Sequence, residues 1–210
     1  MAATLNANAL VDLDPTKIYL NIPLAETSQD DLIRDFINEA SSLIESYCNR
    51  KFREQTITEL RNGGRTYEIV LNQWPVSSIT SVHEDSSRVF GVNTLLDSTE
   101  YMIGENERAE GFTVEKFNSV FAQGRKIIQI IYTFGYALYT DVPSDIQLAC
   151  KRTAAYYFKQ QQNQDFIEIE KSKGNEDIVL IDGLPKSASL ILDNYRRLEM
   201  LGTPDSVRNR

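Results

Sequence analysis

The feature that most constrains this chain is an amphipathic segment at residues 32–47. Its apolar residues recur three or four positions apart, and every residue between them is polar: Leu32, Ile33, Phe36, Ile37, Ala40, Leu43, Ile44 and Tyr47. This spacing predicts a helix with one face packed against the rest of the fold. We expect the helix to span about residues 28–50. Ser28 followed by Asp31 resembles a capping box, and Asp30 and Asp31 favour the positive end of the helix dipole.

Residues 54–141 carry the patterns of β-strands. Segments 56–60 and 66–71 flank Asn62-Gly63-Gly64, which predicts a hairpin. The strongest strand signal is residues 126–134, which contain four isoleucines, two aromatic rings and one threonine. Shorter candidate strands lie at residues 78–82, 101–103 and 112–114.

Helical patterns return after residue 142. A second capping box, Ser144 with Gln147, opens a helix over about 144–162, and Pro185 precedes a last helix over about 186–201. We therefore predict an α+β fold: a small antiparallel helical bundle with a β-rich block inserted between its first and second helices. In this interpretation residues 1–26 are a lead-in, 27–202 a single domain with a small hairpin-like insertion at about 165–182, and 203–210 a flexible tail. We expect the lead-in and the tail to order on binding.

Composition and charge exclude several classes of protein. The net charge is −8, with 30 acidic and 22 basic side chains, so the basic footprint of a nucleic-acid-binding protein is absent. No apolar run approaches the length of about 20 residues that spans a bilayer. Residues 1–8 lack the basic and apolar regions of a secretory signal. The two cysteines, Cys48 and Cys150, are expected to be reduced, mostly buried thiols.

Candidate catalytic residues are few. The single histidine, His83, follows a predicted strand beside Glu84 and Asp85, and a surface position explains it better than a catalytic base does. One histidine and two distant cysteines do not make an ordinary zinc site. Helix capping and solvation explain the acids Glu105, Glu107, Glu110, Asp141 and Asp145, and core or interface packing explains the aromatic set Tyr132, Phe134, Tyr136 and Tyr139. We predict no catalytic, cofactor or metal site.

A basic cluster follows the first predicted helix, at Arg50, Lys51 and Arg53. Its cations could offset the negative end of the helix dipole. They could also contact an acidic neighbouring subunit, and both interpretations can hold together. We expect the neighbour at this end and on the polar face of the helix.

The order of several short motifs resembles a known family. The first helix ends in Glu45-Ser-Tyr-Cys-Asn-Arg50-Lys-Phe52, and Trp74-Pro75-Val76-Ser-Ser-Ile79-Thr-Ser-Val82 follows in the β block. Next come Tyr132-Thr-Phe-Gly135-Tyr136, then Val142-Pro143-Ser-Asp-Ile146-Gln-Leu-Ala149 with Ala155-Tyr156-Tyr157, and last Leu-Ile-Leu192-Asp-Asn-Tyr195-Arg196. Over about residues 28–200 this order resembles the head–tail connector (adaptor, or head completion) proteins of tailed bacteriophages. The segment 166–182 is a longer insertion than that family leads us to expect.

The resemblance implies a structural role without catalysis. Such proteins form a ring, commonly of twelve copies, between the portal protein and a stopper or tail-completion protein. DNA passes through the ring without sequence-specific binding. The implied location is the virion neck, and the host cytoplasm during assembly. The C-terminal region typically meets the portal. The candidate residues for a subunit or portal interface are Arg50, Lys51, Arg53, Tyr195, Arg196, Arg197, Arg208 and Arg210.

Two alternatives stay open at this point. One is a different ring-forming neck or tail-completion protein, which we expect to be dominated by β-structure. The other is a small hydrolase that uses His83 and nearby acids.

Overall fold

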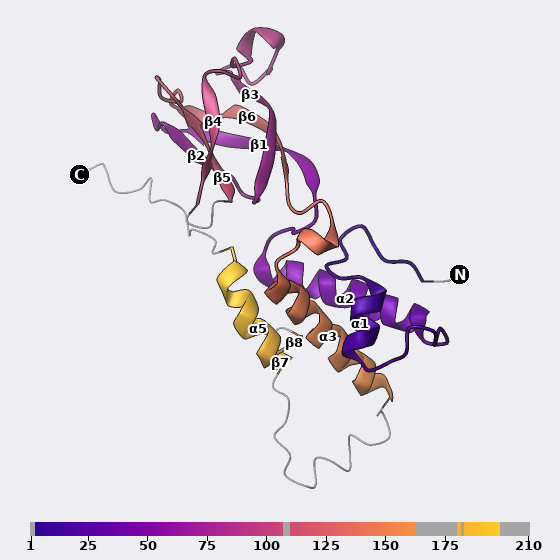
Figure 1. Ribbon diagram of the computed structural model, residues 1–210. Helices are drawn as coiled ribbons and strands as arrows, with labels where there is room; N and C mark the ends of the chain where they lie inside the picture. Colours follow the sequence, from indigo (N-terminus) through magenta and orange to yellow (C-terminus); the bar gives the residue numbers. More distant parts are fainter. Residues whose placement is uncertain (1–2, 107–109, 163–179, 182, 198–210) are drawn as a thin grey trace, which may run out of the picture. The chain divides into compact units, whose positions relative to one another are not determined.

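The computed structural model describes residues 3–106, 110–162, 180–181 and 183–197. The chain forms two compact units: a helical unit from residues 1–50 and 143–210, and a β unit from residues 51–142. Figure 1 shows helices gathered in the first and two sheets in the second. The predicted α+β class is confirmed.

The helical unit is built around two long helices. In the described residues it contains α1 (Leu13–Tyr19), α2 (Asp30–Cys48), α3 (Ser144–Gln162) and α5 (Lys186–Leu192), with a 3₁₀ turn at Asp193–Tyr195 and the short strand pair β7 (Leu180–Ile181) and β8 (Leu184–Pro185). Helix α3 packs against both α2 and α5 (Figure 1). On α2 the fully buried residues Ile33, Ile37, Ala40 and Ile44 follow the predicted apolar face.

Two helix predictions need correction, and one prediction cannot be compared with the structure over most of its length. Ser28 does not cap α2: the N-cap residue is Gln29, which makes no side-chain cap hydrogen bond. The last α-helix ends at Leu192 rather than near 201, because the chain tightens into the 3₁₀ turn and then extends at Arg196. Most of the predicted hairpin-like insertion at 165–182 lies outside the described residues, although Leu180 and Ile181 do pair with β8.

The lead-in is an integral part of the helical unit. Leu10 and Val11 are almost completely buried, so the expectation that these residues order only on binding is wrong. The lead-in also covers part of the polar face of α2: the Leu10 amide donates to Ser41 Oγ (3.1 Å), and Asn8 Nδ2 donates to Glu45 Oε2 (3.2 Å). That part of the face therefore serves the chain's own packing and is not free for a neighbouring subunit.

A buried lysine joins the lead-in to α2. Lys17 is 1% exposed, and its ammonium donates to the carbonyls of Leu24 (3.0 Å) and Glu26 and pairs with Asp30 Oδ1 at 2.7 Å. All three of its donors are thus used, which is the condition under which a buried ammonium is tolerated. Asp30, expected to act through the helix dipole, also binds this cation.

The β unit contains two three-stranded antiparallel sheets. The first has the order β1 (Gln55–Gly63), β6 (Gly124–Phe134) and β3 (Val76–Glu84), and the second the order β2 (Glu68–Val70), β5 (Gly111–Lys116) and β4 (Tyr101–Glu105). Short 3₁₀ turns lie at Val92–Thr94 and Tyr139–Asp141. The strongest predicted strand is the central strand of the first sheet, and its Ile128, Ile130 and Tyr132 are fully buried.

The predicted hairpin of residues 56–60 with 66–71 is wrong. Strand β1 continues through Asn62 and Gly63 and pairs with β6, whereas β2 belongs to the other sheet. Gly63 lies where an added Cβ would meet the Ala122 carbonyl oxygen, so this glycine serves a close approach of two chain segments instead of a turn.

A buried polar cluster joins β1 to β6. Tyr132 donates to Glu59 Oε2 at 2.6 Å, Arg61 pairs with Glu59 Oε1 at 3.2 Å, and the amide of Gln73 donates to the Tyr132 hydroxyl at 3.2 Å. Burial and the Glu59 carboxylate raise the pKa of Tyr132 far above its ordinary value. The aromatic residues Tyr132 and Phe134 are core residues, as expected.

Candidate assembly surface

The C-terminal end of α2 and the 3₁₀ turn after α5 come together in the helical unit. The Tyr47 hydroxyl donates to Asp193 Oδ1 at 2.5 Å, and the Arg196 guanidinium lies over the Tyr47 ring, 5.1 Å from its centroid. The Arg197 amide donates to the Cys48 carbonyl (2.8 Å), which satisfies one of the last carbonyls of the helix. The hydrogen bond to Asp193 raises the pKa of Tyr47.

This contact gathers three of the predicted interface residues. Tyr195 donates to Asp145 Oδ2 at the start of α3 (2.7 Å), which anchors the turn on a second helix. Arg196 is exposed, and Tyr195 and Arg197 are half-buried. The sequence did not indicate that Tyr47 and Asp193 belong to the same surface, because they lie 146 positions apart. Arg208 and Arg210 lie outside the described residues.

The other predicted basic cluster is divided between the two units. Arg50 belongs to the helical unit and is 3% exposed. Lys51 and Arg53 belong to the β unit; Lys51 is exposed, and its backbone amide donates to Gln73 Oε1 (2.9 Å). These three cations were expected to act as one patch, but only Lys51 offers a largely exposed side chain.

The candidate catalytic residues have structural partners. His83 lies within β3, half-buried, and not in a surface loop; its Nδ1 is 3.3 Å from Thr94 Oγ1. Asp141 accepts from the Leu138 amide, Asp145 from Tyr195, and Glu110 from Tyr136. Glu107 lies outside the described residues. Hydrogen bonding thus accounts for Glu110, Asp141 and Asp145.

Both cysteines are buried and free. Cys150 Sγ lies 3.6 Å from Ser41 Oγ, and Cys48 Sγ lies 3.9 Å from the Leu192 carbonyl. Burial raises the pKa of each thiol to about 12. Such thiols are poor nucleophiles and metal ligands at neutral pH.

Within the described ranges, no group of three or more His, Cys, Asp or Glu side chains has the arrangement to hold a metal ion. In the same part of the chain, no helix has the length and apolar character that crossing a membrane requires.

The described residues therefore make an α+β protein. Its candidate surface is a packing contact between the end of α2 and the 3₁₀ turn after α5. A model of the family described as head completion protein matches residues 9–198, so the chain belongs to the head completion protein family. The predicted family and its structural head-completion role in a virion are thereby confirmed. Among curated protein sequences, none matches the chain.

Three similar solved structures share the fold. A chain described as the neck of an empty GTA particle, computed with C6 symmetry, matches with a TM-score of 0.61 and 14% identity. A chain of the virion of a native gene transfer agent (GTA) particle has a TM-score of 0.61 and 15% identity. The neck of a native GTA particle, computed with C12 symmetry, has a TM-score of 0.59 and 15% identity. Each match covers 95% of both chains.

Proposed function

We propose that this chain forms a ring of twelve copies in the neck of a phage-like particle, between the portal and a stopper or tail-completion protein. The observation that carries the proposal is the family match over residues 9–198, together with a fold shared over 95% of the length of neck proteins. Those similar chains come from necks computed with C6 and C12 symmetry. Both symmetries support a cyclic arrangement, and C12 symmetry supports twelve copies.

The charge of the chain suits a channel that DNA crosses. At −8 per copy, twelve copies carry about −96. Acids facing the lumen would repel the phosphate backbone and let DNA slide without binding. Locating the acidic residues on a ring structure tests this hypothesis, and a lumen lined with lysine and arginine would contradict it.

The C-terminal end of the described helical unit is the part proposed to meet the portal. Arg196 is exposed there, held over Tyr47, and residues 198–210 continue from it. Removing residues 186–210 is a poor test, because Ala188 and Leu192 are completely buried and their loss would unfold the unit. Ending the chain after Arg197 leaves this core intact.

The experiment is a portal-binding assay with the full chain, the chain ending at Arg197, and the Arg196→Glu variant. We expect both changes to weaken binding at least tenfold while the helical circular dichroism signal is preserved. Lys159→Glu is the matched control, because Lys159 is an exposed cation at the far end of α3. Unchanged portal binding by both variants would refute the assignment of this surface.

A hydrolase that depends on His83 is the alternative that this proposal displaces. His83→Ala should form rings on the portal as the natural chain does. A variant that folds normally but fails to support head completion at a step after assembly would instead favour chemistry at His83.

A further inference from the structure

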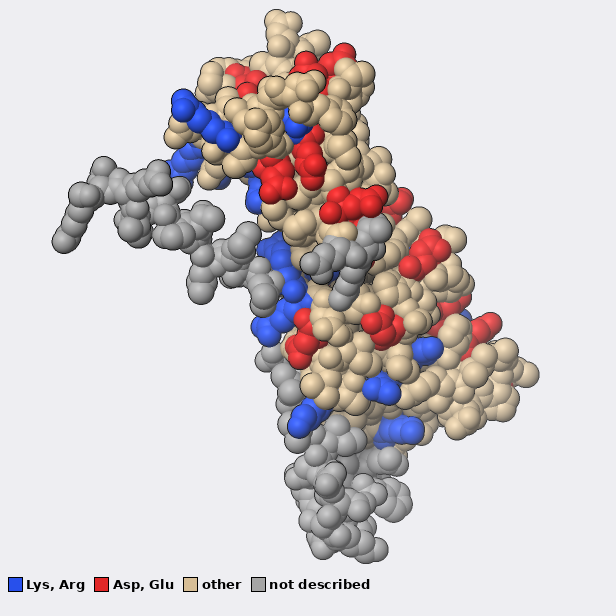
Figure 2. Space-filling model, turned by 60° about the vertical axis from the view of Figure 1, so that its left-hand side comes forward, with Lys and Arg blue, Asp and Glu red and all other residues tan. Residues whose placement is uncertain are grey.

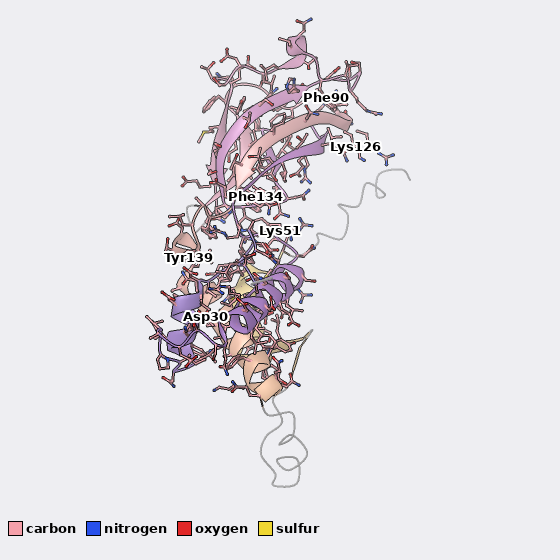
Figure 3. All side chains as sticks on the ribbon, turned by 90° about the vertical axis from the view of Figure 1, so that its right-hand side faces the viewer. Asp30, Lys51, Phe90, Lys126, Phe134 and Tyr139 are labelled. Carbon is pink, nitrogen blue, oxygen red and sulfur yellow. The ribbon has the colours of Figure 1, made fainter. Side chains whose placement is uncertain are left out.

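The β unit carries a loop with an apolar tip, residues 85–96, here called the tip. Two valines project from it with unusual exposure: Val89 is 78% exposed and Val92 is 86% exposed. Figure 3 shows Phe90 in this loop at one end of the β unit, beside Lys126, and Phe134 at the other end.

Partly buried hydrogen bonds hold the tip in place. The Asp85 carboxylate accepts from the backbone amides of Ser87 (2.8 Å), Val89 (2.9 Å) and Phe90 (2.9 Å) and from the Ser87 hydroxyl (2.6 Å). At the other side of the loop, Thr94 Oγ1 lies 3.3 Å from His83 Nδ1, and the Leu96 amide donates to the Val82 carbonyl at 2.9 Å.

The backbone of the tip is also strained. Arg88 has a φ of 61° and Phe90 a φ of 53°, in the left-handed region that non-glycine residues rarely adopt. Such strain persists only where the surroundings impose it, and it is concentrated in segments with a function. A loop that fixes two exposed valines in advance loses little conformational freedom when they are buried in a partner.

Three exposed cations flank the tip: Arg88, Arg125 and Lys126. Arg88 Nε donates to the Arg125 carbonyl at 3.1 Å, which places them together. None of the three makes an ion pair with a carboxylate of the described residues. Figure 2 shows most of the Lys and Arg side chains on the visible face of the β unit concentrated at one edge.

The second sheet carries the complementary surface. On the face opposite the buried Ile69 and Val114, Glu68 stands directly opposite Glu115, and Met102 follows in the same row. Like charges that face each other across strands destabilise a sheet. Among the described residues no ion pair relieves these two carboxylates. Met102 is 45% exposed, so the row, here called the outer row, offers both an apolar contact and negative charge.

We propose that the tip of one copy docks on the outer row of the next copy, with Val89 and Val92 against Met102 and the three cations facing Glu68 and Glu115. Among the described residues these cations and carboxylates form no ion pair, although Glu115 Oε1 accepts from the Thr113 hydroxyl at 3.0 Å; this leaves their charges available for a contact between copies. A contact of two different surfaces is heterologous, and repetition by a closing rotation gives a ring. This inference rests on the proposed ring and adds the surfaces that build it.

The test measures ring formation on the portal by electron microscopy and the protein concentration that gives half occupancy. The natural chain tests the proposed function: if it forms no ring, both proposals fall. If it does, Val89→Ser/Val92→Ser should raise that concentration at least tenfold with unchanged thermal unfolding. Leu138→Ser is the matched control, since Leu138 is 59% exposed in the same unit but outside the tip, and it should assemble normally.

A charge exchange identifies the partner surface. Arg88→Glu/Arg125→Glu and Glu68→Lys/Glu115→Lys should each impair ring formation. The chain carrying all four changes should recover it, because positions 88 and 125 then again face side chains of opposite charge. Rings that form normally with either double variant overturn the inference. So does the absence of recovery in the fourfold variant. If the tip variants form rings but no longer bind the tail-side protein or retain DNA, the tip serves that partner and the contact between copies is refuted.

Discussion

Lys17→Met is the most direct test of how the lead-in is attached to the bundle. Methionine keeps most of the apolar stem of lysine, so the substitution removes the ammonium while leaving little empty volume. It leaves Asp30 Oδ1 without its cation and the Leu24 and Glu26 carbonyls without their donor. Removing one partner of a buried ion pair costs about 3–5 kcal/mol. The Asp30 side chain is 14% exposed, so water can compensate in part, and we expect a loss of about 3 kcal/mol.

The assay is chemical denaturation followed by the helical circular dichroism signal, which reports on the helical unit. Lys159→Met is the control, because an exposed lysine should change the free energy of unfolding by no more than about 0.5 kcal/mol. Adding Asp30→Asn to Lys17→Met should restore about 1 kcal/mol, since the remaining group then carries no charge. A loss below about 1 kcal/mol for Lys17→Met, or no restoration in the double variant, would refute this account of the buried lysine.

Three further predictions concern the β unit. Hydrogen bonds lower the pKa of Asp85 to about 2, so its stabilising effect should be complete above pH ~4 and lost as the pH falls toward 2; acid titration should therefore destabilise the natural chain more than Asp85→Asn. Tyr132→Phe should cost about 1.5–3 kcal/mol in denaturation, because it removes a hydrogen bond to the buried Glu59 carboxylate, and a loss below about 0.5 kcal/mol would contradict that. Gly135→Ala should lower the free energy of unfolding by about 1–3 kcal/mol, because φ is 92° and the new Cβ would lie 2.6 Å from the Arg53 carbonyl oxygen; a neutral result would show that the backbone can relax there.

Local periodicity predicted the parts of the fold that depend on one segment alone. Helix α2 lies where the apolar residues recur at helical spacing, and β6 lies where β-branched and aromatic residues concentrate. Both signals come from residues that are buried because of their own chemistry, so they are visible without knowledge of the partner.

Predictions that depended on distant partners were less successful. The glycine pair at 63–64 indicated a hairpin, but β1 pairs with β6, whose residues lie more than 60 positions later. The polar face of α2 appeared available in the sequence, although Leu10 and Asn8 bind Ser41 and Glu45. Polar residues in a helix pattern do not reveal whether water or another segment satisfies them.

The candidate surfaces likewise combine residues that the sequence indicates with contacts that only the fold reveals. The basic residues near positions 50 and 196 were visible in the sequence, but the contact of Arg196 with Tyr47 required the fold. The sequence did not indicate the tip at 85–96, because exposure of Val89 and Val92 depends on hydrogen bonds to Asp85 that composition does not predict.

The measurement that tests the central claim most directly is electron microscopy of the full chain mixed with its portal protein. The account predicts a closed ring of twelve copies at the outer end of the portal, with the portal channel continued through its centre. Portal particles without added density, or with isolated copies that do not close into a ring, would contradict it.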